Sequence, residues 1–268
     1  MNSKYKVISD YMTTNKLKLN SDKTHLMLMM PDQARRRKPD FNISLNTNNE
    51  LILPTESEKM LGGIIHQNLN IQNDKESLIK GLTTRLNGLR KISKVASFKT
   101  RKMLANGIFM SKLLYLMPLW GGCEKYLILS LQKIQNKAAR IVTKADWFTP
   151  TETLLLQCGW LSVHQLICYH SLILVFKVLD KKSPVYLFEK LSSDFPYKTR
   201  FATQDKIRIG GSQYGFMDLS QKSFRCRASK QWNQLPANLR MPTTLKKFKK
   251  LLFQWVQTNV PTKPNIDD

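Results

Sequence analysis

The spacing of apolar residues changes from a strand-like to a helical period along this chain, and the change constrains the fold more than any other feature. Short segments in the first 65 residues alternate apolar and polar positions, as in Phe41–Leu45. From Leu78 onward the apolar residues recur every three or four positions. These are the periods of a half-buried strand and an amphipathic helix. The sequence therefore predicts an α+β fold with a short β-rich beginning and a predominantly helical remainder.

Four strand-like segments precede the change. Leu26–Met30 is a short apolar run closed by Pro31, as a buried strand would be. Phe41–Leu45 and Leu51–Leu53 are separated by Asn- and Thr-rich turn residues and predict a hairpin. Met60–Ile65 is a further strand candidate whose two glycines indicate a bulge or a close backbone approach.

Three consecutive helices are expected next, and their short links favour a small bundle. The first carries an apolar stripe, and the second is expected from Lys99 to Met117, where Pro118 breaks it. The third has an apolar face, with Gln132 and Gln135 expected on the polar side. The stripe of the first helix is Leu78, Leu82, Leu86, Leu89, Ile92 and Val95, and that of the third is Leu127, Leu131, Ile134, Ala138 and Ile141.

Further helices are expected towards the end of the chain. Thr149 is expected to cap a helix that has Pro150 in its first turn. Val163–Leu179 is apolar nearly all round and predicts a central buried helix; the run inside it is too short for the ~20 residues of a membrane span. A short strand is possible at Ile207–Ile209, and a last helix begins near Thr243. We expect domains at 1–70, 71–147 and 148–268.

Charge narrows the choice of partner. The chain has 43 Lys and Arg against 19 Asp and Glu, a net charge of +24. A field of this sign concentrates polyanions, of which nucleic acid is the commonest. Contact with an anionic membrane and a ribosomal or chromatin-type role are the alternatives, and we expect no membrane contact. The four cysteines form no C-x-x-C pair, and the first residues are not a signal peptide. An intracellular protein, nuclear or cytoplasmic and not secreted, is therefore expected.

Motifs for catalysis are missing from the sequence. The single adjacent acidic pair is Asp267–Asp268 at the chain end, and no phosphate-binding, dinucleotide-binding, zinc-protease or serine-hydrolase motif occurs. His164 and Cys168 lie four positions apart, but two ligands without a third are better explained as part of a packed helix. We therefore expect no enzyme activity from this chain alone, no metal site and no cofactor.

Basic clusters and tryptophans are the candidates for binding. Three clusters are able to contact phosphates, although a solvated helix face is an equal explanation for the last of them. Trp147, Trp160, Trp232 and Trp255 lie near basic residues and are able to stack on bases. Core packing is the favoured explanation for Trp160 and Trp255. The clusters are Arg35, Arg36, Arg37 and Lys38; Lys80, Arg85, Arg90, Lys91 and Lys94; and Lys246, Lys247, Lys249 and Lys250.

Six motifs in order resemble the C-terminal part of the reverse transcriptase of non-LTR, LINE-type retrotransposons of the Jockey-like group. They cover nearly the whole chain, from about Ser9 to Trp255. The chain differs from the family at Ser162, where proline is usual, and near Gln165, where arginine is frequent. The motifs are SDYMTTNKLKLNSDKTHLMLM from Ser9, KMLGGII from Lys59, LQKIQNKAARIVT from Leu131, CGWLSVHQL from Cys158, SPVYL from Ser183, and KSFRCRASKQWNQLPANLR from Lys222 with FKKLL from Phe248.

The resemblance implies a palm tail, a helical thumb and a C-terminal helical domain. Lys23 matches the palm lysine thought to protonate pyrophosphate. The KMLGGII segment is similar to the strand pair called the primer grip, which implies a hairpin with Leu61, Gly62 and Gly63 in its turn. The basic stripe from Lys80 to Lys94, with Lys137 and Arg140, would lie on the thumb along the duplex. The family's Mg²⁺-binding aspartates belong to a Tyr-x-Asp-Asp hairpin and an earlier strand, and we expect them upstream of this chain.

Two functional hypotheses follow. The first is an incomplete reverse transcriptase that binds template–primer nucleic acid, RNA or an RNA–DNA duplex, mainly through the backbone, but lacks the catalytic aspartates. The second is a standalone host protein, basic and nucleic-acid-binding or scaffolding, without a polymerase role. A basic structural protein with an accidental resemblance is the weakest alternative. The sequence does not define the oligomeric state.

Overall fold

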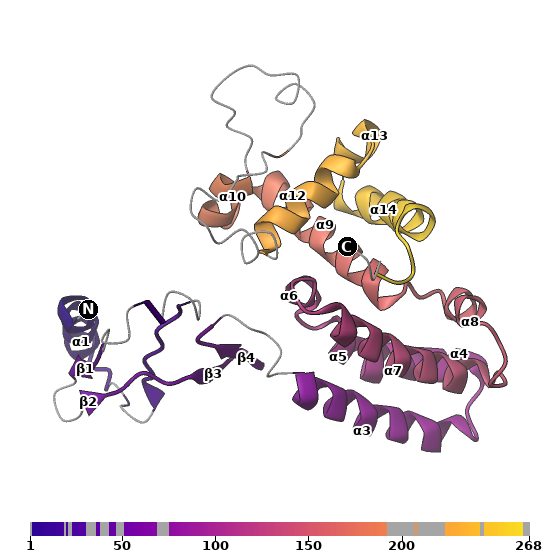
Figure 1. The fold of residues 1–268 in the computed structure, drawn as a ribbon, viewed down its shortest axis with the longest axis horizontal. Coiled ribbons are helices and arrows are strands. Elements are labelled where there is room, and N and C mark those ends of the chain that lie inside the picture. Colours follow the sequence, from indigo (N-terminus) through magenta and orange to yellow (C-terminus); the bar gives the residue numbers. More distant parts are fainter. Residues whose placement is uncertain are drawn as a thin grey trace. The chain divides into compact units, whose positions relative to one another are not determined.

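The chain forms two compact units, Met1–Glu76 and Ser77–Asp268, in a computed structural model. It is mostly helical, with a small antiparallel strand region near the N-terminus, which confirms the α+β class (Figure 1). The expected boundary at residue 147 lies inside the second unit. The described residues are 2–18, 20, 23–30, 36–37, 43–46, 51–68, 75–191, 207, 223–241 and 244–264.

The first unit contains one helix and two short hairpins. Helix α1 spans Asn2–Thr14. Strands β1 (Leu45–Asn46) and β2 (Leu51–Ile52) pair antiparallel, with Leu45 opposite Ile52. This pairing confirms the expected hairpin in its described part, whereas Phe41 and the turn residues lie outside the described residues.

The strand predicted over Leu26–Met30 is wrong. Leu26 makes an isolated bridge with Pro54, and the residues that follow it form no ladder. The Leu26 carbonyl accepts a hydrogen bond from the Thr55 amide at 2.7 Å, whereas the Met30 amide donates to the Gln67 carbonyl at 2.9 Å. The two ends of the run thus bond to different segments, and a strand needs one continuous partner.

Local period alone predicts one strand over Met60–Ile65, which is wrong because the chain reverses within it, whereas the strand pair with a turn at Leu61–Gly63 that the resemblance implies is present. Strands β3 (Ser57–Met60) and β4 (Gly63–His66) pair antiparallel across a two-residue turn. The turn residues Leu61 and Gly62 have φ angles of 48° and 81°. Positive φ at both positions is the pattern of a type I′ turn, which matches the twist of the flanking strands. Gly62 therefore serves the turn rather than a bulge.

Helix α3, Lys75–Ser93, begins the helical region as its period predicts. Its leucine stripe from Leu78 to Leu89 is buried, but the stripe ends earlier than expected. Ile92 is 41% exposed, and Val95, beyond the helix end, is 92% exposed. The last turn of α3 thus projects past the residues that cover the leucines.

The second helix is broken earlier than predicted. Leu116 has a left-handed φ of 58°, which ends the helical path before Pro118. Pro118 then lies in the first turn of the next short helix, where a missing amide hydrogen costs nothing. The region consists of α4 (Phe98–Leu104), the π-helix η3 (Ala105–Met110), α5 (Ser111–Leu114) and α6 (Met117–Trp120).

Helices α7 (Lys125–Thr143) and α8 (Thr151–Cys158) form a packed pair. Two sequence predictions fail here. Gln132 and Gln135 are buried, at 7% and 0% exposure, rather than on the polar side. The residue that precedes α8 is Pro150 and no side chain caps the helix, so Thr149 is not its cap.

Helix α9, Val163–Lys181, is the central helix of the second unit, as predicted. It is long and apolar enough to cross a membrane, but most of its apolar stretch is buried inside this unit. Phe176 of α9 stacks on Phe248 with ring centroids 4.5 Å apart. The helices that surround it include α6, α7, α10 (Val185–Leu191), α12 (Phe224–Gln234) and α14 (Leu245–Asn259), and α13 (Ala237–Arg240) packs on α14 (Figure 1).

Around α12 the described part includes one residue of the strand expected at Ile207–Ile209. Ile207 is buried, and its amide and carbonyl both bond to the Asn233 side chain at 2.8 Å. The other two residues of that prediction lie outside the described residues.

A buried polar network joins α7 to the start of α9. Gln135 Nε2 donates to the Leu161 carbonyl at 2.9 Å, and Gln132 Oε1 accepts from the Val163 amide at 2.7 Å. Ser162 caps α9 and forms a capping box with Gln165. These bonds satisfy backbone groups that a helix start leaves without intrahelical partners. The network therefore fixes the position of α9 against α7.

Replacing Gln135 with methionine should destabilise the second unit. Gln135→Met keeps the volume but leaves the buried Leu161 carbonyl without its donor, a loss of about 2 kcal/mol. Lys133→Met, on an exposed position of the same helix, is the control and should change the free energy of unfolding by less than about 0.5 kcal/mol. Urea denaturation followed by circular dichroism measures both. Equal stability of the two variants would show that the network contributes little.

Candidate nucleic-acid interface

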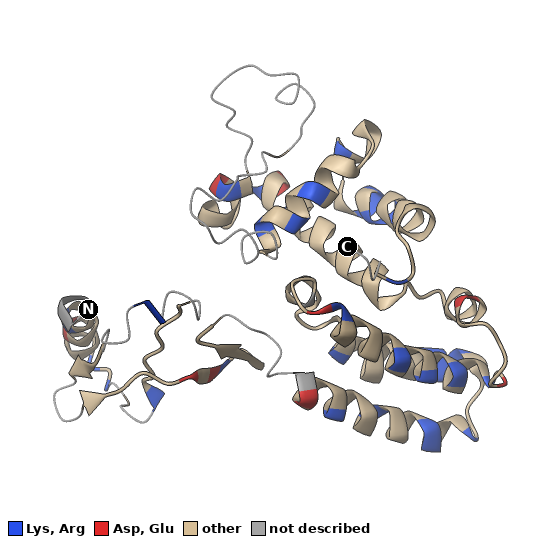
Figure 2. Cartoon of the chain, viewed as in Figure 1, with Lys and Arg blue, Asp and Glu red and all other residues tan. Residues whose placement is uncertain are grey.

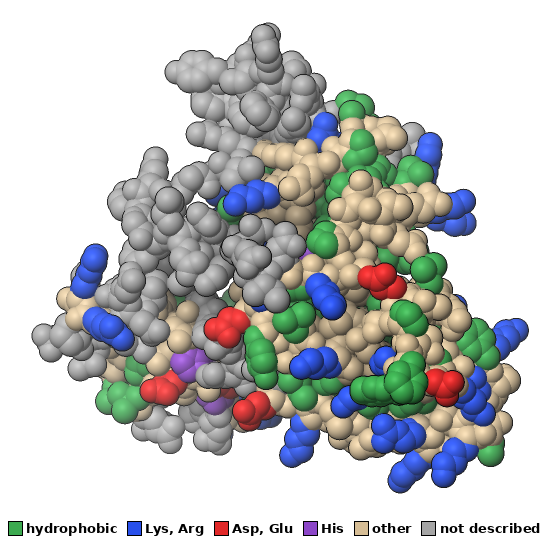
Figure 3. Space-filling view, turned by 45° about the vertical axis from the view of Figure 1, so that its right-hand side comes forward, with side chains coloured by type: hydrophobic (Ala, Val, Ile, Leu, Met, Phe, Trp, Pro, Cys, Tyr) green, Lys and Arg blue, Asp and Glu red, His purple; other side chains and the backbone are tan. Residues whose placement is uncertain are grey.

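The first helices of the second unit carry an almost purely basic surface. Between Ser77 and Lys144 the sequence has fourteen Lys or Arg residues and a single acidic residue, Glu124. Basic positions recur along α3 and α7 in Figure 2. Figure 3 shows Lys and Arg side chains protruding from the lower right of the molecule, where these helices lie. Such a surface attracts anions.

Helix α3 and the residue that follows it, Lys94, present five of these cations, called here the α3 row, because the opposite face of the helix is used for packing. Its leucines turn inward, so the polar positions between them face solvent. No carboxylate of the described residues lies within salt-bridge distance of any of the five. Arg85 Nη1 makes a long 3.5 Å contact with the Ile108 carbonyl. The exposed residues are Lys80, Arg85, Arg90, Lys91 and Lys94.

On α7 the two predicted contacts differ in their surroundings. Lys137 is exposed. Arg140 is half-buried, and its Nη2 donates to the carbonyls of Trp147 at 3.3 Å and Thr149 at 3.4 Å. Its guanidinium carbon also lies 5.0 Å from the centroid of the Trp147 ring. Lys137 is free to meet a phosphate, whereas Arg140 holds the turn that follows α7.

Arg101 shows that a cation in this region is not always available to a ligand. It is 6% exposed, with Nε donating to the Val142 carbonyl at 2.7 Å and Nη1 to the Ala96 carbonyl at 2.6 Å. These bonds tie the link between α3 and α4 to the end of α7. The sequence does not distinguish Arg101 from its exposed neighbours, because folding brings its two carbonyl partners, those of Val142 and Ala96, next to it.

The predicted lysine cluster of α14 is exposed on a different surface. Phe248, Leu252 and Val256 are buried, and α14 packs against α9. The lysines around these buried positions are exposed, and α14 lies apart from α3 in Figure 1. The structure therefore does not bring the two clusters together. The four exposed lysines are Lys246, Lys247, Lys249 and Lys250.

In the first unit the predicted residues are spread over separate segments. Lys23, Arg36 and Arg37 are exposed, whereas Arg35 and Lys38 lie outside the described residues. Leu61 is 84% exposed at the tip of the β3–β4 hairpin, an unusual place for a leucine with positive φ. Gly62 completes this turn and Gly63 is buried at the start of β4.

The tryptophans divide clearly between core and surface. Trp232 is buried in the core, and Trp160 is 8% exposed with its Nε1 donating to Asn106 Oδ1 at 2.9 Å. Trp255 is half-buried. The position of Trp160 agrees with the core packing favoured for it, whereas Trp255 is only partly buried and lies outside the buried core. Trp147 is 73% exposed.

The pair His164 and Cys168 is part of a packed helix, as expected. His164 Nδ1 lies 3.0 Å from the Pro261 carbonyl oxygen, and Cys168 is buried. Within the described ranges there is no group of three or more His, Cys, Asp or Glu side chains that could hold a metal ion.

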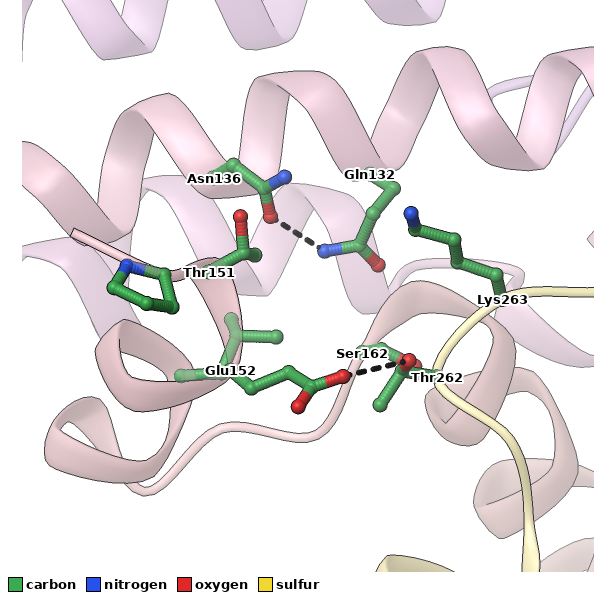
Figure 4. A pocket seen from close by; sticks show the side chains of 9 residues that line it. Gln132, Asn136, Thr151, Glu152, Ser162, Thr262 and Lys263 are labelled. Carbon is green, nitrogen blue, oxygen red and sulfur yellow. Dashed lines mark hydrogen bonds between the residues drawn. The ribbon is translucent and has the colours of Figure 1, made fainter. Parts of the chain in front are cut away.

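A small cleft of about 300 Å³ opens where α7, α8 and the end of the chain meet (Figure 4). Four of its polar side chains bond to one another in two pairs. Gln132 Nε2 donates to Asn136 Oδ1 at 2.7 Å, and the Thr262 hydroxyl bonds to Glu152 Oε1 at 3.4 Å. The bond between Thr262 and Glu152 thus links the segment after α14 to α8. Its lining is Gln132, Asn136, Pro150, Thr151, Glu152, Leu155, Ser162, Thr262 and Lys263.

Comparison with known proteins returned no match: no protein-family model, curated protein or solved structure is similar to this chain. The candidate interface therefore rests on charge, exposure and hydrogen bonding in the structure itself.

Three of the four cysteines, Cys123, Cys158 and Cys168, should be poor nucleophiles at neutral pH. Burial raises the pKa of Cys168 to about 12 and the pKa values of Cys123 and Cys158 to about 11. A raised thiol pKa means less thiolate, which is the reactive form. In the native chain at pH 8 these thiols should react with an aromatic disulfide reagent about a hundredfold more slowly than in urea. A thiol that reacts rapidly before unfolding would contradict this expectation.

Proposed function

We propose that this chain is the C-terminal part of a non-LTR retrotransposon reverse transcriptase and binds template–primer nucleic acid through a palm tail and a thumb. Three observations support the proposal. Six family-like motifs occur in the right order. A small antiparallel strand region is followed by helices, as the palm tail and thumb would require. The proposed thumb, α3 to α7, carries the basic surface.

The exposed row of cations on α3 is the observation that carries the proposal. Its five charges lack carboxylate partners among the described residues, so their mutual repulsion is not relieved inside this part of the chain. Nucleic-acid phosphates relieve it and release condensed counterions, which favours binding of any sequence. A row along one helix is suited to contacts with a phosphate backbone, which position a duplex without reading its bases.

The proposed role is binding, without polymerisation by this chain alone. Phosphoryl transfer by two metal ions needs several carboxylates that hold them about 4 Å apart. The sequence has no Tyr-x-Asp-Asp segment, and the described residues offer no group of three possible ligands. The described residues therefore do not fit a pair of Mg²⁺ ions. Lys23 would assist pyrophosphate release only beside such a site.

A standalone host protein that binds nucleic acid is the alternative function, favoured by the same basic surface. The hairpin tip separates the two proposals. If Leu61 and Gly62 meet a primer end, the chain should prefer an RNA–DNA hybrid with a recessed 3′ end over a blunt hybrid, and Leu61→Ala should remove the preference. Equal affinity for the two hybrids in competition binding would favour the standalone protein.

Removing two cations of the α3 row should weaken duplex binding and its dependence on salt. In Lys91→Gln/Lys94→Gln, two phosphate contacts are lost, so the slope of log affinity against log salt should fall by about 2. Fluorescence anisotropy of a labelled RNA–DNA hybrid at several salt concentrations measures this slope.

The matched control removes the same charge elsewhere. Lys181 and Lys190 are exposed lysines near the end of α9 and on α10. Lys181→Gln/Lys190→Gln lowers the net charge equally but should leave the slope within experimental error of the unaltered chain. Equal slopes for the two double variants would mean that net charge alone drives binding and that α3 is not the interface.

A further inference from the structure

Two neighbouring aromatic side chains are exposed in the turn between α7 and α8. Trp147 is 73% exposed and Phe148 is 92% exposed. Phe, Tyr and Trp side chains usually bury most of their surface, about 150–250 Å² each. An adjacent pair left in solvent therefore indicates a surface that binds another molecule.

The turn is held in place by Arg140 rather than by burial of its rings. The Thr149 amide donates to the Asp146 carbonyl at 3.2 Å, which closes the turn. Arg140 donates to the carbonyls of Trp147 and Thr149, and its guanidinium lies over the indole ring at 5.0 Å. The guanidinium thus occupies one face of the ring. Because the side chain is largely exposed, its other face remains open to a ligand.

The turn also lies at one end of the basic surface. Lys144 follows the last residue of α7, and its Nζ is 3.5 Å from the Lys94 carbonyl at the end of α3. The ends of α3 and α7 are therefore side by side, with Lys91, Lys94 and Lys144 all exposed there. Asp146 and Glu152 are the acidic residues of the turn and of the start of α8, and both are exposed.

We propose that residues Asp146–Thr149 form a stacking platform for the unpaired bases of a single-stranded nucleic acid. The proposal rests on the proposed function, because it places a single strand beyond the duplex that α3 would contact. Bases have flat apolar faces that stack on aromatic rings, while the phosphates between them need cations nearby. Exposed aromatic rings beside Lys94, Lys144 and Arg140 meet both requirements.

The test compares a single strand with a duplex. A labelled homopyrimidine strand of about 16 nucleotides and a blunt RNA–DNA hybrid are titrated with the full chain. Trp147→Ala/Phe148→Ala should bind the single strand about tenfold more weakly, while hybrid affinity stays within about twofold. Trp147→Phe keeps a ring and should retain most of the single-strand affinity.

Tyr186→Ala is the matched control, because Tyr186 is 66% exposed on α10, outside the turn. It should leave both affinities unchanged. Unchanged single-strand affinity in the double variant would overturn the platform. An equal loss for both ligands, or a loss of self-association in size-exclusion chromatography instead of a loss of binding, would overturn it as well.

The outcome also separates this inference from the proposed function. If hybrid binding does not depend on Lys91 and Lys94 but single-strand binding depends on Trp147, the platform stands and the thumb role fails. If hybrid binding depends on the two lysines but single-strand binding ignores Trp147, the thumb role stands and the platform is rejected.

Discussion

A buried pair of glutamines organises the second unit. Gln132 and Gln135 lie within an otherwise apolar face of α7 and bond to the backbone at Leu161 and Val163. Buried amides are tolerated only when their hydrogen bonds are made, so the network admits one arrangement of α7 against the start of α9. Gln165 extends it by donating to the Val260 carbonyl at 2.8 Å. Three distant parts of the chain are thereby held together.

Because the apolar faces of these helices pack against one another, most basic residues lie on the solvent-exposed faces. The leucines of α3 turn towards its neighbours, and the cations between them have no inward position to occupy. Arg101 and Arg140 are exceptions that hold links between helices through backbone carbonyls. The remaining cations are concentrated on an exposed surface next to the exposed aromatic turn. Stability and the proposed binding thus depend on opposite faces of the same helices.

The sequence predicted the periodic features well and the non-periodic ones poorly. The leucines of α3 and the central position of α9 follow from local spacing and were found correctly. The single strand that local period predicts over Met60–Ile65 failed, because Leu61 adopts positive φ, which its residue type does not favour; the turn there was expected only from the family resemblance. The burial of Gln135 was missed because a glutamine between lysines usually faces solvent, and its partner is 26 residues away.

The sequence by itself determined the α+β class, the helical stripes and the strong positive charge, because each depends on residue type and local period. Only the tertiary structure decided which polar and aromatic residues lie inside. Trp147 and Trp160 are the same residue type and lie close together in the sequence, yet Trp160 bonds to Asn106 in the interior and Trp147 stays exposed over Arg140. The reason is physical: burial depends on partners brought together by folding, which local sequence does not contain.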